Sequence, residues 1–97
     1  MSEPEQTVSF IGFVISIAHT AAVHFGDVAV PGEPEPAAPD LAAAQQMIDI
    51  LALLEQKTKG NLTAEERQVL EQVLYDLRLR YVQAQKDADD RPRIIQP

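Results

Sequence analysis

The residues best suited to chemistry in this chain are two histidines, His19 and His24, with Asp27 three positions beyond the second. Two histidines on one helix share a metal ion most easily when they are four residues apart. These two are five apart, which places them about 140° from each other on a helix of about 100° per residue. They cannot bind one ion within one helix, although two copies meeting symmetrically could bring them together. We predict no metal and no cofactor.

A serine beside a histidine is the second arrangement that could do chemistry. Ser16 lies three residues before His19, and a serine needs such a base to act as a nucleophile. No acid close in sequence could orient the histidine, and the chain has no Gly-rich phosphate loop. We therefore expect no catalytic residue and no enzyme. An enzyme or metal site around His19 and His24 is the remote alternative.

These residues belong to the first of three predicted helices. Residues 6–26 carry no charge and show apolar residues at helical spacing, which predicts a helix at about 8–25. One side of it is formed by Phe10, Val14, Ile17, Ala21 and Phe25. Another side is a stripe of small residues that would let a second helix approach closely: Ser9, Gly12, Ser16 and Thr20.

The other two helices are predicted to form an antiparallel hairpin, which follows a Pro-rich connector at 27–39. Asp40 is a suitable N-cap for a helix at about 41–59, and Gly60 ends that helix. Thr63 and Glu66 form a capping box that starts a helix at about 64–86. The apolar stripe of the second helix is Leu41, Ala44, Met47, Ile48, Leu51 and Leu54, widened by Ile50.

The third helix is apolar on two sides. Its main stripe is Leu70, Val73, Leu74, Leu77 and Tyr81. Nearly opposite lie Tyr75, Leu79 and Val82, and Asp76 and Arg80 between the sides are expected to pair at i,i+4. Because one hairpin partner covers only one side of a helix, this second side predicts a further neighbour.

The predicted fold is therefore all-α: the hairpin plus the apolar N-terminal helix, completed by self-association into a helical bundle. We expect a disordered leader at 1–6, a single helical domain at 7–86 and a disordered tail at 87–97. The connector would let the first helix pack on its own hairpin or reach another subunit, and both arrangements stay open at this point.

Composition limits the kind of partner. The 97 residues carry a net charge of −7, with 11 Asp or Glu against 3 Lys or Arg in residues 1–75, so nucleic acid is not an expected partner. The chain has no cysteine, which suits a reducing cytoplasm. Its first residues are acidic where a targeting peptide would be basic, so we expect a cytoplasmic protein.

Membrane attachment through the uncharged helix at 8–25 is the main alternative. Eighteen residues would span about 27 Å, close to the hydrocarbon thickness of a bilayer. Two histidines, two serines, a threonine and a glycine count against insertion, as does the lack of flanking Lys, Arg, Trp or Tyr anchors. A protein associated with a membrane is therefore not the favoured interpretation.

Three stretches together resemble one known family: residues 10–21 (FIGFVISIAHTA), 48–63 (IDILALLEQKTKGNLT) and 74–82 (LYDLRLRYV). The chain is similar over about residues 8–83 to a small bacterial family, domain of unknown function 1844, in which a Pro-rich connector also separates the first two stretches. The resemblance implies a bacterial, all-helical protein. It implies no activity, ligand or catalytic residue.

We expect a non-enzymatic interaction or scaffold protein that associates with itself, as a dimer or a multiple of it, and that could also bind another protein. The expected interface consists of Ser9, Phe10, Gly12, Val14, Ser16, Ile17, Thr20, Tyr75, Leu79 and Val82.

Overall fold

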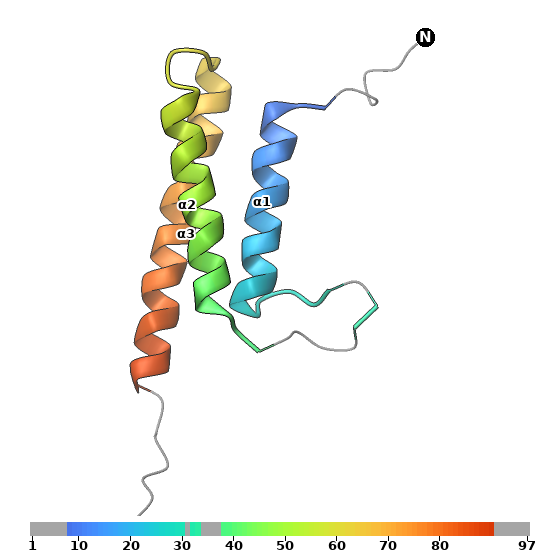
Figure 1. Cartoon of the computed structure of the whole chain (residues 1–97), viewed down its shortest axis with the longest axis vertical. Coiled ribbons are helices and arrows are strands. Elements are labelled where there is room, and N and C mark those ends of the chain that lie inside the picture. Colours follow the sequence, from blue (N-terminus) through green and yellow to red (C-terminus); the bar gives the residue numbers. More distant parts are fainter. Residues whose placement is uncertain (1–7, 31, 34–37, 91–97) are drawn as a thin grey trace, which may run out of the picture.

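The computed structural model of this chain describes residues 8–30, 32–33 and 38–90. This part of the chain forms three helices: α1 (Phe10–Phe25), α2 (Leu41–Lys57) and α3 (Ala64–Asp90). Each helix packs against the other two, and α1 lies along the antiparallel hairpin of α2 and α3 (Figure 1). The predicted all-α class and hairpin are thereby confirmed. The predicted leader and residues 91–97 of the predicted tail lie outside the described residues.

Local hydrogen bonds set the bounds of α1. It begins at Phe10 rather than at residue 8, because Ser9 is extended and its hydroxyl accepts the N–H of Gly12 at 2.9 Å. It ends at Phe25 and is capped by Gly26, which has a left-handed φ of 83° and donates back to the last turn. The helix therefore has a capping residue at each end.

The other two helices also differ from the predicted bounds. α2 ends at Lys57, before residue 59, and Thr58 is its C-cap: the N–H and the hydroxyl of Thr58 both donate to the carbonyl of Leu54. α3 continues to Asp90, past the predicted end at residue 86. No glycine or proline interrupts the sequence before Pro92, so the helix has no reason to stop earlier. The first residues of the predicted tail are thus helical.

One core lies between the three helices. Its buried residues are Val14, Ala21 and Phe25 of α1, Ala44, Ile48 and Leu51 of α2, and Leu70, Leu74, Leu77 and Ala84 of α3. Burial of each large apolar side chain contributes about 1.5 to 3 kcal/mol. The apolar stripes expected from helical spacing supply this core except for Ala84, which was not among the predicted stripe residues. The first helix packs on its own hairpin, which the sequence had left open.

The turn between α2 and α3 is built as a helix stop followed by a helix start. Gly60 has a left-handed φ of 86°. The N–H of Glu66 donates to the hydroxyl of Thr63 at 3.0 Å, and the N–H of Thr63 donates to the Glu66 carboxylate at 2.9 Å. This reciprocal pair satisfies two N–H groups that the helix start leaves without partners.

We predict that Gly60→Val combined with Thr63→Ala lowers the free energy of unfolding by about 2 kcal/mol, about half from each site. A Cβ at Gly60 would meet no atom within 4 Å, so its cost comes from the left-handed backbone. Urea denaturation measures the loss. Gly60→Asn is the control and should lose less, because asparagine tolerates left-handed backbone. Wild-type stability in the double variant would contradict this account of the turn.

Candidate interface on the helical bundle

α1 is the first element of a candidate interface, because none of its 16 residues is an Asp, Glu, Lys or Arg. Its inner side is buried through Val14, Ala21 and Phe25. Its two flanks leave Phe13 and Ile15, which lie about 160° apart around the helix, exposed at 46% and 50%. A helix on a protein surface usually has charged residues on its outer side. An uncharged outer side is therefore unusual for a surface that meets only water.

An ion pair at the C-terminal end of α1 joins this end of the helix to α3. Arg80 of α3 donates two hydrogen bonds to the Asp27 carboxylate, at 2.7 and 2.9 Å. The same guanidinium lies over the ring of Phe25, with Cζ 5.1 Å from its centroid. Nearby, the N–H of Asp40 donates to the carbonyl of His24 at 2.7 Å. These contacts hold the end of α1 against α3 and against the start of α2.

The bidentate bonds to Arg80 lower the pKa of the Asp27 carboxyl below its usual value. Partial burial of the carboxyl acts in the opposite direction and is outweighed. The side chains are 33% exposed for Arg80 and 41% exposed for Asp27, so water screens the pair. Its contribution to stability is therefore modest.

The expected pairing of Asp76 with Arg80 is wrong. Asp76 instead accepts a hydrogen bond from the Gln72 amide at 2.9 Å. Arg80 turns to Asp27, which lies 53 positions earlier in the chain. The i,i+4 rule considers only neighbours on one helix, whereas this partner is brought in by the packing of α1 on α3.

The contact between Phe25 and Arg80 identifies the side of α1 that faces α3. At about 100° per residue, Phe13, Ser16 and Thr20 lie about 120° or more around the helix from Phe25, so they point away from α3.

On α2, Ala52 lines a hollow shared with α3. Ala43 and Ile50 lie about 160° or more around the helix from Ala52, on the side of α1, and Leu53 is next to them. We call the surface made by these residues of both helices the α1–α2 face: Phe13, Ser16, Thr20, Ala43, Ile50 and Leu53.

The α1–α2 face combines exposed apolar side chains with little charge. Phe13, Ile50 and Leu53 are 46%, 39% and 54% exposed. Of the three charged residues of α2, Glu55 lines the hollow. Asp49 and Lys57 both border the face, because each lies four residues from Leu53.

The hydroxyl groups on the outer side of α1 are bonded within their own helix. Ser16 donates to the carbonyl of Phe13 at 2.8 Å, and Thr20 donates to the carbonyl of Ser16 at 3.1 Å. A hydroxyl whose donor is already satisfied can leave water without losing a hydrogen bond. This part of the surface is therefore less polar than its residue types suggest.

The structure separates the ten residues of the predicted interface into three groups. Ser9, Gly12, Ser16 and Thr20 are exposed on α1, and Tyr75, Leu79 and Val82 are exposed on α3. Phe10 and Ile17 are half-buried against the core, and Val14 is fully buried. The prediction is wrong for Val14, because α1 packs on its own hairpin and places this side chain inside the chain's own core.

Sequence reasoning missed Phe13 and Leu53 and assigned Ile50 to the core of α2, although Ile50 is 39% exposed. Helical spacing carries little signal for these positions, because in an apolar helix the exposed residues differ little in type from the buried ones. The rotation that exposes them is set by tertiary contacts.

The two histidines differ in their exposure to solvent. His19 is exposed on the outer side of α1, and His24 is half-buried near the start of α2. Among the residues that the structure describes, no three His, Asp or Glu side chains gather as a metal site would require.

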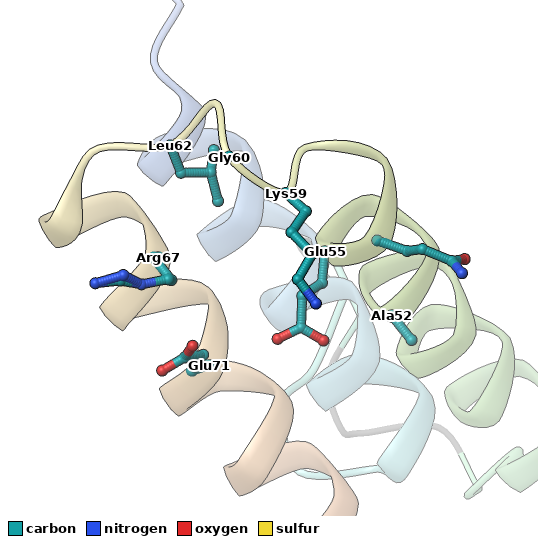
Figure 2. Close-up of a pocket in the computed structure, with 8 residues that line it drawn as sticks. Ala52, Glu55, Lys59, Gly60, Leu62, Arg67 and Glu71 are labelled. Atoms are coloured by element: carbon teal, nitrogen blue, oxygen red, sulfur yellow. The ribbon is translucent and has the colours of Figure 1, made fainter.

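A hollow of about 390 Å³ lies between α2 and α3 at the hairpin end, and its lining residues are Ala52, Glu55, Gln56, Lys59, Gly60, Leu62, Arg67 and Glu71. Figure 2 shows Glu55 and Lys59 between the two helices, whereas Arg67 and Glu71 extend along the α3 side without meeting Lys59. A small-molecule site needs polar groups that converge on one ligand. This arrangement does not provide them.

Within residues 8–30, 32–33 and 38–90, no helix combines the length and the apolar character needed to cross a membrane. α1 has 16 residues, fewer than the 18 on which the membrane alternative rested.

Comparison with known proteins gives one match. A family model described as "Domain of unknown function (DUF1844)" matches residues 7–83 of the chain. No curated protein matches the chain. No solved structure matches it either.

We predict that Asp27→Asn lowers the free energy of unfolding by about 0.5 to 1 kcal/mol near pH 7, because it removes an ion pair. The Asp27 pKa is lowered in the folded state, so the pair stabilises the fold above the unfolded pKa of about 3.9 and stops doing so as pH falls through the folded value. Urea denaturation between pH 7 and pH 2 measures the difference in the free energy of unfolding between the variant and the wild type. This difference should shrink towards zero as the pH falls. Arg80→Gln should remove the same pH dependence, and a difference that is constant with pH would contradict the role of the pair.

We predict that Gly12→Ala is nearly neutral in the wild type but stabilising in a Ser9→Ala background. Alanine favours a helix over glycine by about 1 kcal/mol. A Cβ at Gly12 would lie 2.8 Å from the Ser9 hydroxyl oxygen, which must then turn away and lose its capping bond, a loss of about 1 kcal/mol. A double-mutant cycle by urea denaturation measures the coupling. Equal changes in the free energy of unfolding on Gly12→Ala in the two backgrounds would contradict the predicted coupling.

Proposed function

Because this chain belongs to the DUF1844 family, whose description assigns no activity, we propose from its geometry that it is a non-enzymatic module that associates with itself. Two copies would meet through their α1–α2 faces. The observation that carries the proposal is the uncharged outer side of α1 next to exposed Phe13, Ile50 and Leu53.

Charge supports this choice of surface. Two copies that each carry −7 repel one another, and the repulsion is weakest where the approaching surfaces carry no charge. Beside Leu53 the α1–α2 face carries one acid, Asp49, and one base, Lys57, so its net charge there is zero. Burial of each of its large apolar side chains would contribute about 1.5 to 3 kcal/mol to association.

The size of the face also fits a dimer. The 16 residues of α1 extend for about 24 Å, and two packed helices present a layer about 20 Å wide. Such a layer buries about 500 Å² per copy, or about 1,000 Å² in total, which is the lower limit for a specific interface. The internally bonded hydroxyls of Ser16 and Thr20 allow the second copy to approach without leaving a donor unsatisfied.

α3 would remain available for another partner in such a dimer. Tyr75, Leu79 and Val82 are exposed at 63%, 57% and 59% and lie on the side of α3 opposite its core stripe. A dimer that presents this apolar stripe twice would act as a scaffold. The cytoplasm is the proposed location, supported by a cysteine-free chain that suits a reducing compartment.

We predict that the wild type is a dimer at micromolar concentration and that Leu53→Glu is a monomer. A carboxylate at Leu53 would be buried without a partner in the interface, which costs several kcal/mol, about enough to raise the dissociation constant a hundredfold or more. Sedimentation equilibrium or light scattering measures the mass.

Gln68→Glu is the matched control, since it adds the same charge at an exposed position of α3 and should stay dimeric. A monomeric wild type at this concentration would contradict the proposal. A wild type that associates only when detergent is present would favour the membrane alternative.

A further inference from the structure

We propose that the second copy docks on the α1–α2 face in the reversed direction, so that the hairpin end of one copy lies beside the connector end of the other. This inference rests on the proposed self-association and specifies its geometry. It follows from two gradients along the face, one of side-chain size and one of charge.

The register of α1 on α2 determines where each residue lies along the face. The N–H of Asp40 bonds to the carbonyl of His24, so the end of α1 lies at the start of α2. The start of α1 therefore lies beside the end of α2, as Figure 1 shows. Phe13, Ile50 and Leu53 belong to the half of the face near the hairpin turn.

The other half of the face, near the connector, carries small residues. Thr20 of α1 and Ala43 of α2 lie there and project less than Phe13 and Leu53. The longer Gln46, seven residues before Leu53 and on the same side of α2, also lies in this half. The surface is thus higher at the Phe13 and Leu53 positions than at the Thr20 and Ala43 positions. Close packing requires that large side chains of one surface meet small ones of the other.

Reversal of the second copy satisfies this requirement. Phe13 and Thr20 are equally far from the midpoint between Ser16 and Ile17, so a two-fold axis at this midpoint places Phe13 beside the partner's Thr20. The same axis places Leu53 close to the partner's Ala43. A copy in the same direction would stack bulky residues on bulky residues and leave the connector ends apart.

Charge favours the same direction of docking. Lys57 borders the hairpin end of the face, and Asp40 lies at the opposite end of α2. In the reversed arrangement each Lys57 comes close to the partner's Asp40, and the two-fold symmetry makes this pair twice. In the same-direction arrangement, both lysines would lie at one end of the interface and both aspartates at the other, which is less favourable.

Engineered disulfides test the direction, because the chain has no cysteine of its own. If the copies dock in the reversed direction, the Phe13→Cys/Thr20→Cys variant should form disulfide-linked dimers under mild oxidation. A disulfide needs Cα atoms about 4.4 to 6.8 Å apart, whereas positions 13 and 20 of one helix are about 10 Å apart and cannot join within a chain. The single variants Phe13→Cys and Thr20→Cys are controls and should link poorly. In each of them, the cysteine is far from the same cysteine of the second copy.

A charge substitution tests the same geometry without loss of apolar bulk. Lys57→Glu should raise the dimer dissociation constant at least about fivefold, because it replaces two attractive pairs by two repulsive ones. Lys59→Glu makes the same change of charge two positions away, at the hairpin hollow, and should leave the constant near the wild-type value. In a same-direction dimer, Lys57→Glu would only exchange one like-charged pair for another and should have little effect.

The outcomes separate this inference from the proposal on which it rests. Cross-linking of the double variant above both single variants, together with weaker association of Lys57→Glu than of Lys59→Glu, supports reversed docking. A wild-type dimer in which neither effect occurs overturns the reversed direction and leaves self-association in place. A wild type that is monomeric by light scattering overturns both.

Discussion

The packing of α1 against its own hairpin is the contact on which the rest of the structure depends. Val14, Ala21 and Phe25 enter the common core, and Arg80 holds the end of the helix through Asp27 and the Phe25 ring. A helix between two neighbours can bury only part of its circumference. Since no residue of α1 is charged, the buried part and the exposed part are both apolar or weakly polar, and the exposed part is what makes α1 unusual for a surface helix.

The outer side of α1 avoids the usual cost of leaving water. Serine and threonine on a helix can bond to the carbonyls of the preceding turn, and Ser16 and Thr20 both do so here. The small-residue stripe therefore has two causes. Gly12 is small because the capping hydroxyl of Ser9 occupies the space of its missing Cβ, and the other members offer an internally satisfied surface.

The molecule has apolar surface on more than one side, and the two main patches differ in their surroundings. Tyr75, Leu79 and Val82 are carried by α3, a helix rich in charged residues. The α1–α2 face extends over two helices and has few charged residues at its border, namely Asp40, Asp49 and Lys57. Like-charged copies meet most easily across the second kind of surface, whereas an exposed stripe on a single charged helix is better suited to a partner of different charge.

Much of the architecture was determined by the sequence alone. The three helices follow from apolar spacing, and the hairpin follows from Gly60 and from the capping box of Thr63 and Glu66, because these signals act over three or four residues. The family could also be identified from three short stretches. Such local features require no knowledge of the packing.

The tertiary structure decided the packing of α1, its rotation and the partner of Arg80. The connector allowed α1 to pack within the chain or outside it, and the uniform apolar character of residues 8–25 left little to distinguish its inner side from its outer side. Phe13 could not be separated from Phe10 by residue type, and Asp27 could not be matched with Arg80 across 53 positions. These choices depend on contacts between residues far apart in the chain, whose free energies become available only when all three helices have packed together.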